Sequence, residues 1–405
     1  MSPTGAKPKS LKNKNQKLVF KLFRENDYIS ITEAAKTIKL SKTTVIKIFE
    51  YLIQKNLIIF KGKGISSSKG GKKPDLYGLN HLYGYTISVH ILDIKIRLVT
   101  TDTNANIEID RTIPIGNNEP IENVISITSN FINEVTSDAV YISRKLLGLS
   151  IAAPGVADSE KGEILTASRF PSWKYKTPII RMLKEKTSEN FNFHLDNQIR
   201  FICLAEQAIG KARNTKNFLV FSAGSEGVGG GIIIKGNMYI GNNYLAGEIG
   251  HIRIDPASQE VCHCGGRGCF ENVISYDKII NRAKELYKES GNTEDSGSLT
   301  ISIIFNDSNN GNPAAMKVME EFAELYAIGI SNVCMMIDPE LIIITGEIVD
   351  AGDFFIGKLR EKISDISLNN MRKYYDIQYT SFKKNGSILG GAIHSINTFF
   401  DSFFF

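Results

Sequence analysis

The stretch that most constrains how this chain can fold is residues 246–272, AGEIGHIRIDPASQEVCHCGGRGCFEN. In it, His251 precedes Cys262, Cys264 and Cys269, and the cysteines have the spacing Cys-x-Cys-x4-Cys. One imidazole and three thiolates suit tetrahedral Zn²⁺, and a zinc site whose four positions are all filled by protein is structural. The sequence therefore predicts a structural zinc loop with these four ligands.

Two alternatives to this ligand set stay open. His263 lies between two of the cysteines and is an alternative ligand, and free thiols are the alternative to any metal site. The chain has five cysteines in 405 residues, three of them within eight residues. This clustering favours a metal site in a reducing compartment over a disulfide framework, so we expect a cytoplasmic protein. No run of 18 uncharged apolar residues is present, so we expect no membrane-spanning helix.

Charge divides the chain into two unequal parts. Residues 1–80 hold 16 Lys and one Arg against five acidic residues, a net charge of +12, whereas the whole chain carries +5. Well-patterned helices occur within this basic segment. A module that binds a polyanion therefore explains the charge better than a solubilising tail does.

Three helical patterns occur in the basic segment, at 15–25, 32–38 and 42–55. Thr32 is the expected cap of the second helix and Ser41 that of the third. The short turn between these two helices is typical of a helix-turn-helix, whose last helix enters the DNA groove. Short polar and cationic side chains at the start of that helix suit contacts with phosphates and base edges. The expected DNA contacts on this helix are Ser41, Lys42, Thr43, Thr44 and Lys47.

Two short strands, predicted at 57–65 and 75–79, flank the turn SSSKGGKKP. This turn suits a wing that reaches the DNA backbone or minor groove with Lys72 and Lys73, and a flexible linker is the alternative. We therefore expect residues 1–80 to form a winged helix-turn-helix DNA-binding domain.

From residue 84 onward, strands alternate with helices. β-rich runs at 84–101 and 217–236 each lead into a loop and helices, and a further strand is expected at 146–155. This order is typical of an α/β protein with its sites at strand ends. The two β-rich beginnings suit a duplicated, two-lobed domain.

A glycine-rich loop, SAGSEGVGGG at 222–231, follows one of these strands. A phosphate or a sugar could approach such a backbone closely. The loop lacks the Lys of a P-loop, and Glu226 within it would repel an anionic phosphate.

Taken together, these features resemble the ROK family, which contains bacterial sugar kinases and sugar-responsive repressors. The likeness extends from about residue 15 to the C-terminus, and Glu248, His251, the cysteine cluster and Glu271 carry most of it. The winged helix-turn-helix in front is the layout of the repressor branch. Supporting matches are Pro154–Gly155, Trp173 with Pro178, Asn197 with Glu206, and the stretch DPELIIITG from Asp338.

The resemblance implies an actin/hexokinase-like ROK sugar-binding domain over residues 81–405, with Zn²⁺ bracing a loop beside a sugar cleft. The small lobe would comprise about 81–195 and the C-terminal helix, and the large lobe about 196–389. His251 would bind zinc through one ring nitrogen and a sugar hydroxyl through the other. The sugar contacts implied by position are Asn197, Gln198, Glu248, His251 and Glu271.

Several positions depart from the kinase pattern of that family. A kinase has an Asp as general base where this chain has Gln198, and an amide does not accept a proton at neutral pH. A register shift that brings Asp196 to this place is the alternative. In the first phosphate loop, His90 and Leu92 stand where an Asp and a glycine are needed. We therefore expect no catalytic residues and no enzyme activity.

The resulting hypothesis is a sugar-responsive transcriptional regulator, a repressor, that contains Zn²⁺ and binds operator DNA as a homodimer or a dimer of dimers. Sugar binding would close the cleft and shift the population of DNA-binding conformations. One alternative is an ATP-dependent sugar kinase with an attached DNA-binding domain. The other is a scaffold with a vestigial cleft that a protein partner controls.

Overall fold

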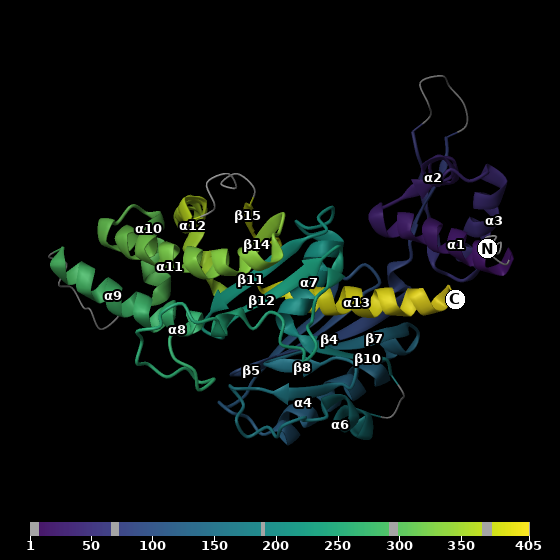
Figure 1. The fold of residues 1–405 in the computed structure, drawn as a ribbon. Coiled ribbons are helices and arrows are strands. Elements are labelled where there is room, and N and C mark those ends of the chain that lie inside the picture. The colour runs from purple at the N-terminus through teal and green to yellow at the C-terminus, as the bar shows by residue number, and fades with distance from the viewer. Residues whose placement is uncertain (1–7, 66–72, 188–190, 291–298, 367–374, 405) are drawn as a thin grey trace, which may run out of the picture.

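The computed structural model describes residues 8–65, 73–187, 191–290, 299–366 and 375–404. Within these residues, an N-terminal helical module precedes two α/β lobes, each built on one five-stranded sheet (Figure 1). No described helix is long and apolar enough to cross a membrane.

The N-terminal module packs three helices against a small antiparallel sheet with the strand order β1-β3-β2. Val45, Phe49 and Leu52 turn one face of the third helix into the core, as the apolar spacing of that helix predicts. The first helix begins at Pro8, seven residues before the predicted start, and the short strand β1 was not predicted. The elements are α1 (Pro8–Glu25), β1 (Ile29–Ser30), α2 (Ile31–Ile38), α3 (Lys42–Gln54), β2 (Ile58–Lys63) and β3 (Asp75–Leu79).

The cap of α2 is Ser30, and the prediction of Thr32 was wrong. The Ser30 hydroxyl accepts a hydrogen bond from the Glu33 amide at 3.2 Å, and the Glu33 carboxylate accepts one from the Ser30 amide at 2.9 Å. This reciprocal capping box satisfies two amide groups at the helix start and leaves Thr32 inside the first turn. Ser41 caps α3 as predicted, accepting a hydrogen bond from the Thr44 amide at 3.2 Å.

The sheet of the small lobe begins with an antiparallel meander, β4-β5-β6, to which β7 and β10 add in parallel beside β4. Helices α4 and α6 bury their apolar stripes on this sheet. The strands are β4 (Gly84–Leu92), β5 (Lys95–Asp102), β6 (Ile107–Pro114), β7 (Lys145–Ala153) and β10 (Phe193–Asn197), with the outlying pair β8 (Val156–Asp158) and β9 (Glu163–Thr166). The helices are α4 (Ile121–Ser137), α5 (Ala139–Ile142) and α6 (Ile179–Lys186).

The sheet of the large lobe repeats this arrangement. Strands β11, β12 and β13 form the meander, and β14 and β15 add in parallel beside β11. This repeat confirms the duplicated, two-lobed fold expected from the two β-rich runs. The strands are β11 (Phe218–Gly224), β12 (Gly227–Ile234), β13 (Asn237–Met238), β14 (Leu341–Thr345) and β15 (Asp376–Tyr379). The covering helices are α8 (Phe270–Val273), α9 (Tyr276–Glu289), α10 (Ile301–Asn309), α11 (Pro313–Ile337) and α12 (Gly352–Ile366).

Two helices cross between the lobes. Helix α7 (Gln198–Ile209) follows the last strand of the small-lobe sheet and packs against β12, whereas α13 (Gly386–Phe403) follows β15 and packs against β7 and β4. The two helices also pack against each other, so each lobe is tied to the other by its own last helix. Figure 1 shows α13 running from the region between the lobes to the N-terminal module.

The C-terminal end of α13 is part of the core of the N-terminal module. Phe400 lies 4.5 Å from Phe20 of α1, measured between ring centroids, and Phe404 lies 5.2 Å from the same ring. At the edge of this contact, Arg24 donates a hydrogen bond to Asn397, and Lys17 pairs with Asp401 at 2.8 Å. The first and last helices of the chain are therefore one packed unit.

Phe400→Ala tests how much this contact stabilises the molecule. The ring is 3% exposed, so its loss should lower the free energy of unfolding by about 3–5 kcal/mol. The matched control is Phe60→Ala, because Phe60 is 55% exposed and its loss should change stability by less than about 0.5 kcal/mol. Thermal melting of both variants measures the difference, and equal melting temperatures would contradict this packing.

Candidate functional site

A cleft of about 980 Å³ lies between the lobes, where the parallel strands of both sheets end. Such strand ends are where α/β folds place ligand sites. The structure brings together, on the lining of this cleft, the whole set of sugar contacts expected from the sequence: Asn197, Gln198, Glu248, His251 and Glu271.

Asn197 enters the cleft at the first turn of α7. Its Oδ1 accepts a hydrogen bond from the Ile199 amide and its Nδ2 donates one to the Gly155 carbonyl, both at 2.8 Å. The side chain is therefore a helix cap held in a fixed orientation. A carboxamide has further donor and acceptor capacity beyond these two bonds, which leaves it able to contact a ligand hydroxyl.

Glu248 and His251 reach the cleft from the loop after β13. The Glu248 carboxylate lies 3.9 Å from His251 Nε2, beyond hydrogen-bond distance, and it accepts no hydrogen bond from the described residues. Burial raises the pKa of Glu248, because its charge is partly removed from water. A half-buried carboxylate with unfilled acceptor positions is suited to receive hydroxyl hydrogens.

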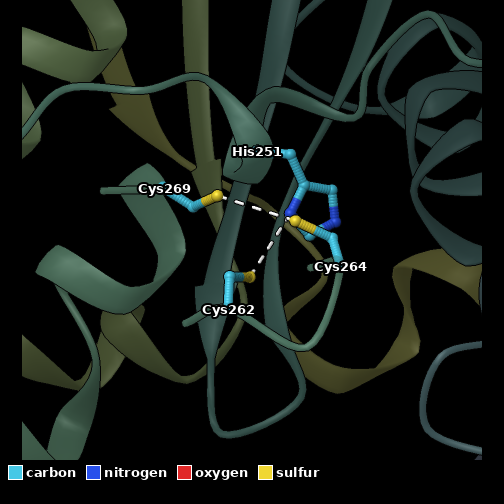
Figure 2. A group of neighbouring side chains, drawn as sticks. All are labelled: His251, Cys262, Cys264 and Cys269. Atoms are coloured by element: carbon cyan, nitrogen blue, oxygen red, sulfur yellow. Dashed lines mark hydrogen bonds between the residues drawn. The ribbon is translucent and has the colours of Figure 1, made fainter. Parts of the chain in front are cut away.

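The predicted zinc ligands lie together and point toward one another (Figure 2). His251 Nδ1 is 3.8 Å from Cys262 Sγ, and the sulfurs of Cys264 and Cys269 are 3.6 Å apart. All four ligand atoms lie within 4.8 Å of one another. Zn–S bonds of about 2.3 Å in a tetrahedron place two sulfurs about 3.8 Å apart, so this set fits a zinc ion.

The two ring nitrogens of His251 face different partners. Nδ1 is directed at the cysteine cluster and Nε2 at Glu248. This orientation matches the expected division between metal and ligand. Burial also raises the pKa of Cys269 to about 12, so a bound cation is what would keep this sulfur as a thiolate.

The alternative ligand, His263, has a different partner. Its Nδ1 lies 3.2 Å from the Glu271 carboxylate and 3.9 Å from Cys262 Sγ. It forms a second candidate metal group with these two residues, but it is not in the group that contains all three cysteines. The geometry therefore favours His251 as the fourth ligand.

Gln198 and His90, the two substitutions noted from the sequence, are hydrogen-bonded to each other. His90 Nε2 donates to the Gln198 carboxamide oxygen at 2.6 Å, because that oxygen only accepts. His90 Nδ1 is then the acceptor for the Ser387 hydroxyl at 3.0 Å. Burial lowers the pKa of His90 to about 4, which keeps the ring neutral in this chain of bonds.

Asp196 does not take the place of Gln198. It is absent from the lining of the cleft, and its carboxylate pairs with the buried guanidinium of Arg200 at 2.9 Å. The register shift considered from the sequence is therefore wrong, and the side chain that faces the cleft at this position is an amide.

The glycine loop 222–231 forms the tight hairpin between β11 and β12, and two of its amide groups donate to carboxylates. The Ser225 amide and hydroxyl donate to the two carboxylate oxygens of Glu347, at 2.8 and 2.9 Å. The Val228 amide donates to Glu271 at 2.8 Å. The sequence shows the flexible glycines of this loop but not the carboxylates that fill it.

Sequence reasoning missed Glu347 and Ser387. Glu347 follows the strand ELIIIT and a glycine, so its position at a strand end was a usable signal. Ser387 had none, because it begins a helix almost 300 residues from its partner His90.

Some of the residues expected to contact DNA are exposed, whereas others form the cap of α3. Lys42, Thr43 and Lys47 are exposed on α3, and Lys73 is exposed beside the loop between β2 and β3. Ser41 and Thr44 are bonded to each other at the helix cap, with 2.8 Å between their hydroxyl oxygens. The remaining expected contact, Lys72, lies outside the described residues.

Comparison with known proteins places this fold and cleft in a family. The sequence profile described as "ROK family" matches residues 86–397, so the chain belongs to the ROK family. Over 387 residues it is 28% identical to the xylose repressor of Caldicellulosiruptor bescii, with 94% of each chain covered. Over 253 residues it is 30% identical to a glucokinase of Halalkalibacterium halodurans, with 61% of this chain and 75% of that one covered.

Solved structures show the same fold. A ROK family transcriptional regulator, described as a homologue of the Escherichia coli MLC protein, superposes with a TM-score of 0.78 at 24% identity. That similarity covers 97% of this chain and 98% of the other.

The two candidate histidines give a matched test of the metal site. In His251→Asn the zinc content of the purified protein should fall well below one ion per chain, and the melting temperature should fall with it, because a structural zinc contributes directly to folding. His263→Asn should retain a full complement of zinc. Elemental analysis of both variants decides, and Cys264→Ser should behave like His251→Asn. Loss of zinc from the His263 variant alone would overturn the ligand assignment.

Proposed function

We propose that this protein is a sugar-responsive transcriptional repressor that binds operator DNA through its N-terminal module and contains a structural Zn²⁺. The observation that carries the proposal is the combination of a basic three-helix module with a cleft whose kinase positions hold an amide and a neutral histidine. The similarity to the xylose repressor supports it, because it spans the N-terminal module as well as both lobes.

The N-terminal module is proposed to be a winged helix-turn-helix over residues 1–80, joined to a ROK domain over 81–405. Helix α3 follows α2 after a short turn and exposes Lys42, Thr43 and Lys47 at its first turns. These side chains suit phosphate and base-edge contacts in a major groove. Lys73 beside the β2–β3 loop suits a backbone contact outside that groove. Ser41 and Thr44 would serve mainly to fix the start of the helix.

The cleft is proposed to hold the sugar without phosphorylating it. Asn197, Glu248, His251 and Glu271 offer donors and acceptors on its wall, and Gln198 stands where a base would be needed. The carboxamide of Gln198 has no accessible proton-accepting form at neutral pH, so transfer of a hydroxyl proton lacks an acceptor there. Xylose is the first sugar to test, because relatives named xylose repressor match almost the full chain.

Regulation is proposed to work through two copies of the chain. A helix-turn-helix protein gains sequence specificity when two modules read two half-sites of a palindrome. We expect a homodimer or a dimer of dimers, with sugar binding shifting the balance between lobe arrangements that fit the operator and those that do not. The protein is expected to act in the cytoplasm, which contains the DNA and keeps cysteine thiols reduced.

Removing the cations of α3 tests the DNA interface. The double variant Lys42→Ala/Lys47→Ala should weaken operator binding, and the slope of log K against log salt should become shallower by about 0.9 for each phosphate that the variant no longer neutralises. Lys174→Ala is the control, since Lys174 is exposed on the small lobe far along the chain from α3. Fluorescence anisotropy over a salt series gives both slopes, and an unchanged slope in the double variant would remove these residues from the interface.

Glu248→Gln tests the sugar site. Replacing a charged acceptor of a sugar hydroxyl should weaken sugar binding by about 1.5–3 kcal/mol, which is roughly 10- to 100-fold in Kd. Glu289→Gln, an exposed substitution on α9, should leave the affinity unchanged. Calorimetric titration with xylose and a panel of hexoses and amino sugars measures both. Sugar-dependent release of ADP from MgATP by the unmodified protein would instead favour the kinase alternative.

A further inference from the structure

We infer that the cleft selects a neutral, unphosphorylated sugar and rejects sugar phosphates, because its glycine loop is already filled by the protein's own carboxylates. This inference rests on the proposed sugar-sensing function and adds the chemical class of the effector. It is carried by the contacts of the β11–β12 hairpin with Glu347 and Glu271 and by the position of Glu226 at the tip of the hairpin.

The hairpin resembles an anion-binding turn, but hydrogen-bond donors of this turn are bonded to carboxylates of the protein. Backbone amides at a tight glycine turn commonly hold phosphate oxygens. Here the Ser225 amide and hydroxyl hold Glu347 and the Val228 amide holds Glu271. A phosphate group would have to displace a carboxylate that is already hydrogen-bonded, and the displaced charge would remain beside it in the cleft.

The charge at the tip of the hairpin adds to this exclusion. Glu226 lines the cleft together with Gln198, and it lies near the acidic groups of Asp93 and Glu347. Burial and these two neighbours raise the pKa of Glu226 to about 7, with Lys95 acting in the opposite direction. A second anion in this place would meet three carboxylates.

Two arginines of the cleft lining have carboxylate partners, and the lysines of the lining, Lys95, Lys383 and Lys384, are exposed to solvent, which screens their charge. Arg169 already pairs with Asp93 at 2.8 Å and donates to the Ser225 carbonyl at 2.8 Å. Arg97 pairs with Asp110 at 2.6 Å and also donates to the Lys384 carbonyl. Both guanidinium groups therefore have their carboxylate partner inside the protein.

The position of the hairpin relative to the sugar contacts determines what it would exclude. Gln198 directly follows Asn197, the cap of α7, and lines the cleft together with Glu226 of the hairpin. A sugar held by Asn197, Glu248 and His251 would present any substituent on its far side to Gln198 and the hairpin. A hydroxyl there can accept a hydrogen bond from Gln198, whereas a phosphate dianion in the same place is repelled by the Glu226 carboxylate.

The test is calorimetric titration with matched pairs at pH 8 in buffer free of phosphate and sulfate. The pairs are xylose with α-xylose 1-phosphate, which keeps the pyranose ring, glucose with glucose 6-phosphate, and N-acetylglucosamine with its 6-phosphate. At pH 8 most of Glu226 is ionised, so the exclusion is at full strength. One unphosphorylated sugar should bind, and its phosphate ester should bind on the order of 100-fold more weakly.

The variant Glu226→Gln shows whether the carboxylate is responsible. Its Kd for the neutral sugar should stay within a few-fold of that of the unmodified protein. The gap, which is the ratio of the Kd of the phosphate ester to the Kd of the neutral sugar, should become smaller by about tenfold or more. Glu347→Gln should also narrow the gap, which protects the test against a single variant that fails to fold. Glu185→Gln, an exposed substitution on α6, is the matched control and should leave the gap unchanged.

The possible outcomes separate this inference from the proposed function. Equal or tighter binding of a phosphate ester would overturn the inference and leave the sugar-sensing function in place. A gap that neither glutamate variant narrows would overturn the assignment to the hairpin. If no sugar and no ester binds, the sugar-sensing function itself fails.

Discussion

The close packing of α13 against α7 and β7 is the constraint on which the rest of this structure depends. A side chain at Gly390 would collide with the Phe201 carbonyl of α7, and one at Gly391 would collide with the Ser150 hydroxyl of β7. Only glycine allows the helix to lie this deep between the lobes. Because α13 is held there, its first turn brings Ser387 to His90 in the cleft, and its last turn brings Phe400 to the N-terminal module.

The cleft itself is shaped by two kinds of rigid support. On one side, the cysteine cluster fixes the orientation of His251, and Phe270, directly after Cys269, is fully buried against Tyr326 of α11. On the other side, a chain of hydrogen bonds runs from Gln198 through His90 to Ser387. Gln198 and His90, at positions where a kinase needs catalytic groups, are hydrogen-bonded within this chain. Such mutual bonding is better suited to binding a ligand than to transferring a proton.

Much of this could be read from the sequence, and the reason differs by feature. The helices and strands followed from apolar periodicity, since Val45, Ile48, Phe49 and Leu52 are the buried face of α3. The clustering of His251 with Cys262, Cys264 and Cys269 followed in part from spacing, because the three cysteines lie within eight residues of one another. The cap of α2 was misplaced because Ser30 and Thr32 are both good caps, and only the partner Glu33 distinguishes them. The bonds between Ser225 and Glu347 and between His90 and Ser387 join residues more than a hundred positions apart, which no local pattern encodes.

The shared core of α1 and α13 also affects the order in which the protein can complete its folding during synthesis. The N-terminal module is synthesised before both lobes, yet Phe400 and Phe404, the partners of Phe20, follow both lobes in the chain. Until then, the apolar face of α1 that will meet α13 is uncovered. The part of the molecule that carries the basic helices is thus among the first to be synthesised and among the last to be completed. The core of the N-terminal module can therefore be completed only after both lobes have been synthesised.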